Sequence, residues 1–492
     1  MHRSSFGSGT SFRRGLGVLA AGALLLASAP ALSRPYHSFE NGLRRSIAIS
    51  GHEQARFSLS ARMQHYRVPG VSVAVIEGCR IVDARGFGAS AGGDPPVTAR
   101  TLFQAGSISK TITAVAALRL VEQGTLQLDH DIRPLVPSWS AGAGPDVSAV
   151  TLRQLLGHTA GLNEVGGKGY ARGTALPTLS QVLDGLPPAN TPAIRIEAKP
   201  GTKWVYSSGG YYVAQAAMTS ATGMSFASLA EMLVFQPSAM LDSSFDQPLD
   251  EGRATDAAKA AGPDGSPMPG GWRVNPELAA GGLWTTPSDL ARFLITLAHD
   301  IRGETGRLLS GNGVRQMMTP GLNNWGLGVE LGPTGGPRRI GHTGHNVGFV
   351  SEYVIYPDSC QGAVVMTNAD QGGSLVTEIL RAIGDAYKWP EPRSSTVQAA
   401  IPLTDAIARR FVGTYQLRDF PAEKFTISRK ADGNLYWARQ GHVGRDLLPE
   451  DEGSLFSPDS RMGLRASDGR ADRALSLDLS FGGGSNIADR VE

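Results

Sequence analysis

The order of strand-like and helical segments is the feature that most limits the folds open to this chain. Two β-rich runs, residues 70–78 and 80–88, meet at Gly78-Cys79 and predict a hairpin. A helical pattern with long Gly/Pro loops then extends to about Glu277. Three further strand-like runs follow at residues 338–344, 351–357 and 362–368, with a helix near 374–387. This order predicts an α+β fold, in which distant segments complete an antiparallel sheet flanked by helices, together with an all-α region.

The C-terminal part of the chain has a different pattern. Residues 388–402 are polar and contain prolines, which is typical of a domain boundary. Beyond them lie short strand-like runs, among them 411–417, 424–429, 434–439 and 473–481. In the last run, polar residues alternate with four apolar ones that we expect on one buried face: Leu475, Leu477, Leu479 and Phe481. The pattern predicts a small antiparallel β domain over residues 393–492, after a main domain over residues 32–392.

The first residues have the features of a targeting signal. Arg3, Arg13 and Arg14 precede an uncharged apolar run at residues 15–27, and Ala29 and Ala31 are the small residues of a cleavage site. We therefore expect a signal peptide over residues 1–31 and an exported protein, periplasmic or secreted. A retained membrane anchor is the alternative, but the run is short for a span, and no later apolar stretch is uninterrupted. Arg13-Arg14 resembles a twin-arginine signal without its usual Phe, which leaves the export route open.

The composition narrows the choice of partners. The chain has 46 Lys and Arg against 44 Asp and Glu, with no long run of like charges, which argues against a nucleic-acid partner. We expect a small-molecule or peptide substrate as the partner, and the sequence leaves a homo-oligomer open. Cys79 and Cys360 are too few for a disulfide scaffold, although an exported chain can form one bridge.

The stretch "FQAGSISKTITAV", residues 103–115, places a serine and a lysine in the first turn of a helix predicted to begin near Gly106 and to stop at Gly124. Ser107 and Lys110 are three positions apart, so they lie on one helix face and the amine can reach the hydroxyl. A helix cap is the alternative role for Ser107. A capping box, however, has Glu or Gln at the position of Lys110, and the helix dipole disfavours a cation in the first turn.

A chemical role accounts for this poorly placed lysine. If burial lowers the pKa of the amine, neutral Lys110 can accept the proton of Ser107, and free backbone N–H groups at the helix start can stabilise an oxyanion. The pattern S-x-x-K alone is weak, because it is expected by chance in a chain of this length. A phosphate-binding P-loop fits less well, since Ser109 stands where that motif needs Gly.

Two distant stretches supply further candidate site residues. "KWVYSSGGYYVA", residues 203–214, presents Tyr206 with Ser208 two positions later, and "GHTGHNVGF", residues 341–349, presents His342-Thr343-Gly344 at a strand end. Taken singly, a buried tyrosine and a loop histidine are the simpler interpretations. His342 and His345 have the spacing of metal ligands, but no acidic or cysteine partner is nearby, so we predict no metal and no cofactor.

Taken together and in this order, "SISK", "YSS" and "HTG" resemble the S-x-x-K, Y-x-N and K-T-G elements of the serine β-lactamase and penicillin-binding-protein superfamily. Within it, the chain is most similar to the branch of class C β-lactamases, DD-carboxypeptidases, D-amino-acid peptidases and related esterases. The resemblance covers about residues 55–387, with support from "LLGHTAGL" (155–162), "GGLWTTPSDLARF" (281–293) and "WGLG" (325–328). The segment from "FVGTYQL" onward resembles the lipocalin-like β domain often appended to such hydrolases.

The resemblance implies an exported serine hydrolase that acts through an acyl-enzyme on D-amino-acid peptides or β-lactam-like amides. Ser107 would be the nucleophile, Lys110 its base or proton relay, and Tyr206 the group that protonates the leaving group and helps activate water. In this fold the first and last strands of the sheet are antiparallel neighbours. The resemblance therefore also predicts a Cys79–Cys360 disulfide.

The "HTG" strand is implied to bind the substrate. His342 would orient the substrate carboxylate and tune Tyr206, with Thr343 and Gly344 beside it, and the backbone N–H groups of Ser107 and His345 would form the oxyanion hole.

One substrate-binding position departs from the family pattern. Ser208 stands where Asn normally contacts the catalytic lysine and the amide carbonyl of the substrate, and serine is shorter and lacks the amide donor. The change favours a small-ester carboxylesterase of the same fold as an alternative. A penicillin-binding sensor that acylates without turnover, or a scaffold with an inactive site, is the alternative from another class.

Overall fold

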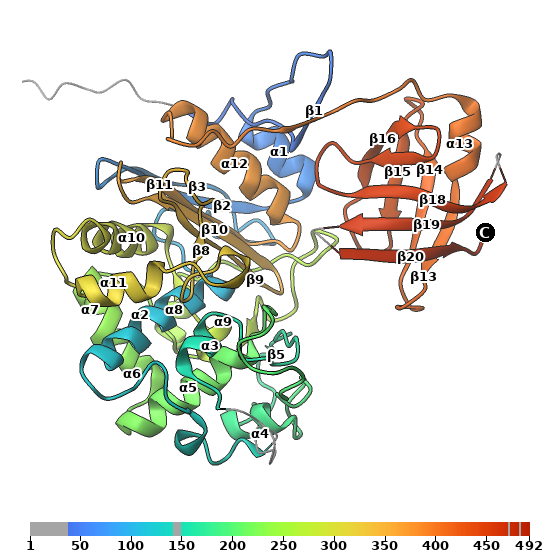
Figure 1. Ribbon diagram of the computed structural model, residues 1–492. Coiled ribbons are helices and arrows are strands. Elements are labelled where there is room, and N and C mark those ends of the chain that lie inside the picture. The colour runs from blue at the N-terminus through green and yellow to red at the C-terminus, as the bar shows by residue number, and fades with distance from the viewer. Residues whose placement is uncertain (1–37, 141–148, 471–472, 482–483) are drawn as a thin grey trace, which may run out of the picture. The chain divides into compact units, whose positions relative to one another are not determined.

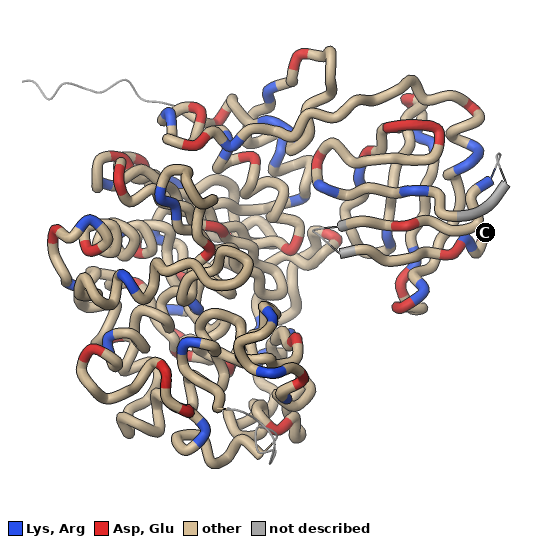
Figure 2. Tube along the Cα trace, viewed as in Figure 1, with Lys and Arg blue, Asp and Glu red and all other residues tan. Residues whose placement is uncertain are grey.

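The computed structural model describes the chain except for residues 1–37, 141–148, 471–472 and 482–483. The predicted signal peptide, residues 1–31, lies outside the described residues. Within the described part, no helix combines the length and the apolar character needed to cross a membrane. Among the described residues, Lys and Arg are interspersed with Asp and Glu, and no long stretch carries one sign (Figure 2).

The main domain is built around a six-stranded antiparallel sheet, as the order of segments predicted. The hairpin β2 (Gly70–Glu77) and β3 (Arg80–Gly88) adds to three strands from much later in the chain. The strand order is β3-β2-β11-β10-β9-β8, and every neighbouring pair is antiparallel. The remaining strands are β8 (Glu330–Leu331), β9 (Ile340–Asn346), β10 (Phe349–Tyr356) and β11 (Gln361–Thr367).

Both faces of this sheet are buried. In β2, Val71, Val73 and Val75 pack against α1 (Leu59–Tyr66) and α12 (Gly372–Ala386), whereas Ala74 and Ile76 join the core of the helical region on the other face. Alternate side chains of a strand point to opposite faces, so one apolar run serves two cores. Figure 1 shows α1 and α12 along one face of the sheet and the other helices of the main domain on the opposite side.

The helical region lies between the hairpin and β8 in the chain. Its longer helices are α2 (Ser109–Glu122), α5 (Gly209–Thr222), α10 (Pro287–Ile301) and α11 (Gly311–Met318). Its shorter ones are α3 (Leu152–Leu156), α4 (Leu179–Asp184), α6 (Phe226–Ala230), α7 (Gln236–Ser238), α8 (Glu251–Ala254) and α9 (Leu278–Gly281). Two short pairs, β4 (Phe103–Gln104) with β7 (Trp284–Thr285) and β5 (Tyr170–Ala171) with β6 (Arg273–Val274), tie its loops together.

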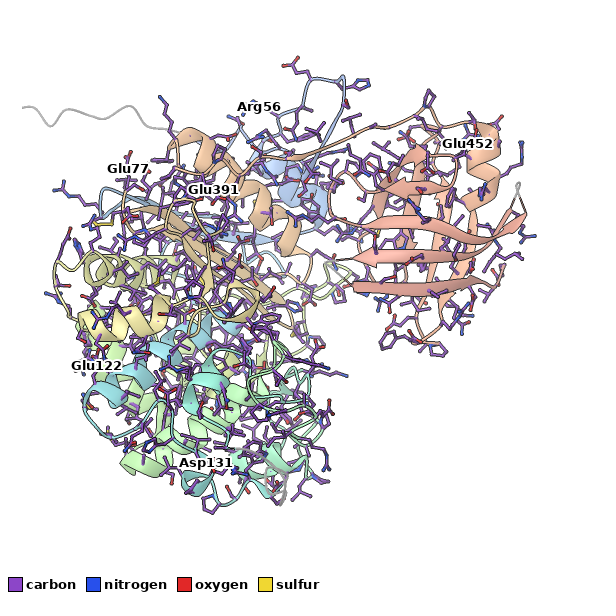
Figure 3. All side chains as sticks on the ribbon, in the orientation of Figure 1. Arg56, Glu77, Glu122, Asp131, Glu391 and Glu452 are labelled. Carbon is purple, nitrogen blue, oxygen red and sulfur yellow. A yellow bond between two sulfur atoms is a disulfide. The ribbon has the colours of Figure 1, made fainter. Side chains whose placement is uncertain are left out.

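Helix α2 is the central helix of this region. Every residue from Ser109 to Leu118 is buried, which is the pattern of a helix enclosed on all sides. Its C-terminal residue Glu122, labelled in Figure 3, accepts hydrogen bonds from the backbone N–H groups of Ser310 and Gly313 at the start of α11. The helix ends as predicted, because Gly124 follows with φ +74°.

The turn of the first hairpin brings the two cysteines together. Gly78 and Cys79 have φ of +55° and +58°, the two positive values that a type I′ hairpin turn requires. Cys79 forms a disulfide with Cys360, whose turn connects β10 to β11, and the two Cα atoms are 5.0 Å apart. The bond links the first and last long strands of the main sheet.

The C-terminal residues form a closed eight-stranded antiparallel barrel, which makes the predicted antiparallel β domain more specific. Helix α13 (Asp405–Phe411) precedes it and contributes Ile407 and Phe411 to its core. The strands follow one another in chain order: β13 (Gly413–Leu417), β14 (Lys424–Arg429), β15 (Leu435–Arg439), β16 (Arg445–Asp451), β17 (Ser454–Phe456), β18 (Gly463–Arg470), β19 (Arg473–Phe481) and β20 (Gly484–Arg490).

Two details of this part differ from the sequence-based expectation. Leu475 is 53% exposed although Leu477 and Leu479 are buried, because the β18–β19 pairing is irregular next to Ser476 and the inward face changes there. The polar segment before the barrel is also not a free linker. Its residues Thr396–Gln398 form β12, which pairs in parallel with β1 (Ile47–Ile49).

Candidate active site

Two glycines allow the loop before α2 to contact β9. Gly106 has φ +54°, and a Cβ on it would come within 2.6 Å of the backbone nitrogen of His345. A Cβ on Gly344 would come within 1.9 Å of the Ala105 carbonyl oxygen. Neither position therefore has room for a side chain. This close approach brings the backbone of Ser107, in the short 3₁₀ helix Gly106–Ile108, beside the backbone of His345.

The start of α2 is also fixed from the other side, by α9. Ser109 Oγ donates to the Gly106 carbonyl at 2.6 Å and accepts from the Leu283 N–H at 3.1 Å. One turn later, Thr113 Oγ1 donates to the Ala279 carbonyl at 2.8 Å. These buried hydrogen bonds hold the residues between them in a defined position against α9.

Lys110 lies in this fixed segment and is fully buried. Its Nζ donates to Ser107 Oγ at 2.9 Å and to the Ala280 carbonyl at 3.1 Å. Its nearest aromatic ring is that of Tyr206, 5.0 Å from Nζ to the centroid. Burial lowers the pKa of the Lys110 amine to about 7, because the charged form loses its hydration. The predicted serine–lysine contact is thus present, with the amine neutral in a large fraction of molecules at neutral pH.

Tyr206 precedes α5 and belongs to the same cluster. Burial raises the pKa of its hydroxyl to about 12, and the hydroxyl of Ser107 lowers this pKa in part. Its ring packs against His158 at 4.4 Å and Trp325 at 5.9 Å between centroids. Tyr206 is therefore held as a neutral phenol, able to give and accept a proton near Ser107.

The sequence analysis assigned no role to His158 or Trp325. Both lie in stretches that supported the family resemblance, "LLGHTAGL" and "WGLG", but neither motif indicates that these rings surround Tyr206. His158 Nδ1 accepts from the Ser207 N–H at 3.2 Å. Burial and then the charge of Lys110 hold the pKa of His158 well below its usual range, so the ring is neutral.

His342 is buried beneath the cluster rather than exposed to the cavity. Its Nδ1 lies 2.6 Å from the Thr343 carbonyl oxygen, which can only accept, so Nδ1 carries the proton. Burial and the charge of Lys110 lower the pKa of His342 to about 3. A neutral ring with Nδ1 protonated offers Nε2 as an acceptor. Contact with a substrate carboxylate, the role expected from the resemblance, would require this ring to be protonated.

A cavity of about 240 Å³ opens at Ser107. Of the sequence-predicted residues, its wall includes Ser107, Tyr206, Ser208 and His345, and does not include Lys110, His342, Thr343 or Gly344. The wall also includes residues that the sequence analysis did not single out: Glu164, Tyr212, Asn275, Glu277 and Asn346.

His342 and His345 do not converge on a common ligand position. They are three residues apart on β9, so their side chains point to opposite faces, one buried and one exposed. His345 Nε2 lies 3.2 Å from Asp370 Oδ1. Among the described residues there is no group of three or more His, Cys, Asp or Glu side chains that could hold a metal ion.

Comparison with known proteins gives this site a family. The family model "Beta-lactamase" matches residues 58–388, which contain every residue of the site. The chain belongs to the Beta-lactamase family. That family assignment and the Ser107–Lys110–Tyr206 geometry make the protein a serine hydrolase with the fold of acyl-enzyme hydrolases.

Three similar proteins illustrate the range of this family. Penicillin-binding protein 4 of Amycolatopsis lactamdurans is 26% identical over 68% of this chain and 88% of its own length. The D-alanyl-D-alanine-carboxypeptidase/endopeptidase AmpH of Escherichia coli (strain K12) is 25% identical over 63% of this chain and 84% of its own. The octameric penicillin-binding protein homologue from Pyrococcus abyssi has the same fold, with a TM-score of 0.55, 22% identity, and coverage of 88% of this chain and 98% of the other.

Proposed function

We propose that the protein is an exported hydrolase that forms an acyl-enzyme on Ser107 and cleaves D-amino-acid peptides or β-lactam-like amides. The observation that carries the proposal is the buried Lys110 amine, which lies 2.9 Å from Ser107 Oγ and forms no ion pair with any described residue. The carboxypeptidase and penicillin-binding relatives support the substrate class. The apolar N-terminal segment, residues 15–27, supports export.

The proposed reaction has two stages. Neutral Lys110 accepts the Ser107 proton while Oγ attacks the substrate carbonyl, and the backbone N–H groups of Ser107 and His345 stabilise the oxyanion. Tyr206 passes its proton to the leaving group and is reprotonated by Lys110, so that the acyl-enzyme remains with both groups neutral. Water, activated by the same Lys110 and Tyr206, then attacks the ester and releases the product and Ser107. His342 is neutral and is buried next to Tyr206, so its role is to influence the surroundings of the Tyr206 hydroxyl and not to bind the substrate.

Covalent labelling tests this proposal. A fluorescent penicillin or a fluorophosphonate should modify the purified protein on Ser107, located by peptide mass spectrometry, and leave Ser107→Ala unlabelled. Ser180→Ala is the control, because that serine is exposed on α4 and is not part of the cavity wall at Ser107. If neither reagent labels the wild-type protein, the proposal is wrong.

Small-ester hydrolysis is the second candidate, and Ser208 is the observation that favours it. Ser208 lines the cavity, and its hydroxyl interacts with the Tyr212 hydroxyl. A serine also has no amide group that could donate to a peptide-like substrate. Rates on a nitrophenyl ester, a chromogenic cephalosporin and a D-alanyl peptide decide between the two. If Ser208→Asn raises the rate on the peptide relative to the ester, the serine accounts for the preference.

A further inference from the structure

Glu277 is a buried carboxyl group in the catalytic cavity that the proposed mechanism does not use. It is 2% exposed and immediately precedes α9. Its carbonyl accepts from the Ala280 and Gly281 N–H groups, and the Ala280 carbonyl in turn accepts from Lys110 Nζ. Glu277 therefore lies one helical turn from the residue that binds the catalytic lysine, a separation of about 5 Å along the helix axis.

Neither carboxyl oxygen of Glu277 has a hydrogen-bond partner among the described residues. The Tyr170 hydroxyl faces the carboxyl without a hydrogen bond of normal geometry, and accepts from the Asn190 N–H. The space in front of Oε2 is bordered by Gly167 and the Tyr212 hydroxyl, since a Cβ built on Gly167 would lie 3.9 Å from Oε2 and 3.3 Å from that hydroxyl. A buried acceptor without a donor is costly, so its retention inside a cavity indicates a partner that comes with the ligand.

The charges around the cavity favour a cation as that partner. Among the described residues that line it are Glu164, which is exposed, and Glu277, and no lysine or arginine. Lys110 lies outside the lining. Burial raises the pKa of Glu277 to about 7, while its own backbone N–H and Tyr170 lower that pKa only in part. A bound cation would restore the ionised form by pairing with it.

We propose that Glu277 binds an ammonium group in the acyl portion of the substrate, so that the enzyme prefers acyl groups that carry a free amine. The inference rests on the proposed acyl-enzyme function and specifies its substrate class. The ammonium would approach Glu277 Oε2 from the cavity, in the space that Gly167 and the Tyr212 hydroxyl border.

Matched amide substrates test the preference. D-Alanine 4-nitroanilide is compared with its N-acetyl derivative, and 6-aminohexanoic acid 4-nitroanilide with the hexanoyl compound, so that α-amines and distal amines are separated. We expect the wild-type protein to favour the free amine in at least one pair, and Glu277→Gln to reduce that kcat/KM ratio about 10- to 100-fold. The loss should appear mainly in KM, because the ammonium contact is present before and during the reaction.

Two further variants keep the test independent of folding. The ratio within one variant cancels any loss of folded protein. Glu164→Gln removes the other carboxylate of the cavity and should reduce the ratio less than Glu277→Gln, because an exposed charge contributes little. Gly167→Ala keeps the carboxylate but narrows the space in front of it, and should reduce the ratio as well.

The possible outcomes separate this inference from the proposed function. A wild-type preference for the N-acetyl or hexanoyl compounds, or a ratio unaffected by Glu277→Gln, overturns the ammonium site while Ser107 acylation stands. An equal fall of both rates in Glu277→Gln also overturns it, since the residue would then be structural. Failure of penicillin and fluorophosphonate to label Ser107 removes the proposed function itself.

Discussion

Two buried basic side chains of the main domain have opposite surroundings. Arg62, on α1, is 3% exposed and donates to both oxygens of Glu378 on α12, at 2.8 and 2.7 Å, and to Asp459 at 2.7 Å. Lys110, on α2, is fully buried and bonds only to a hydroxyl and a carbonyl. The first is a paired charge that joins helices. The second is an unpaired amine beside the nucleophile.

The pKa values follow this difference. Burial favours the neutral form of both groups, but the hydrogen bonds and charge of Glu378 outweigh it at Arg62 and raise the pKa of the guanidinium. At Lys110 no acidic side chain of the described residues opposes burial, and the pKa falls to about 7. The comparison shows that a buried base is suited to catalysis when it lacks an ionic partner, because the pairing that stabilises a charge also prevents its loss.

The largest expected effect is on activity, in Lys110→Met. Removing the amine should lower the rate of Ser107 acylation about 10²- to 10⁴-fold, because the nucleophile loses its base. The free energy of unfolding at pH 7 should not fall, since the variant no longer buries a costly amine. Labelling kinetics and urea denaturation measure the two quantities. A variant that is both active and destabilised would assign Lys110 a structural role instead.

Arg62→Met should show the converse behaviour. It leaves the Glu378 carboxylate buried without its cation, whereas Asp459 keeps its contacts with Arg45 and His65. The change should lower the free energy of unfolding by about 3–5 kcal/mol. Labelling of Ser107 per folded molecule should persist. Arg56→Met, at an exposed position labelled in Figure 3, is the control and should change stability by less than about 0.5 kcal/mol. Equal stability of the two variants would contradict the assignment of Arg62 as a structural ion pair.

The pH dependence of acylation sharpens the contrast. Below a pKa of about 7, protonation removes the Lys110 lone pair, so the rate of fluorophosphonate labelling should fall about tenfold per pH unit toward acid. Among the groups around Lys110, His342 with a pKa of about 3 and Tyr206 with a pKa of about 12 do not titrate near neutrality. Glu277 does, so the profile is repeated with Glu277→Gln, which should keep the acid limb.

The smallest expected effect is a slope of stability with pH. Between about pH 7 and 10 the unfolded chain keeps the Lys110 proton and the folded protein has lost it, so stability should rise with pH. Relative to Lys110→Met, the rise should approach about 1.4 kcal/mol per pH unit. It should be absent from the difference between wild type and Arg62→Met, because both proteins keep Lys110 and Arg62 stays charged throughout this range. A flat difference curve for Lys110 would indicate a normal amine pKa.

Much of the fold was predictable because local patterns and burial agree. The hairpin at Gly78-Cys79, the distant strands and the end of α2 near Gly124 all follow from period-2 or helical patterns with turn residues. The prediction that Leu475 is buried was wrong, because an irregularity in strand pairing changes which face is buried. Pairing is not encoded in one strand alone. The β1–β12 pair was missed because a three-residue strand has no readable periodicity.

The features of the candidate site can also be separated into those that the sequence determined and those that only the tertiary structure decided. The sequence by itself determined the Ser107–Lys110 spacing, the order of the three motifs and the identity of Tyr206, because these are chemical groups at fixed offsets along the chain. Only the tertiary structure decided that His342 is neutral next to Tyr206, and that Lys110 lacks a counterion and Glu277 a hydrogen-bond partner among the residues that the structure describes. Burial and ion pairing depend on contacts between segments that are far apart in the chain. These contacts determine which of the site residues can carry a charge.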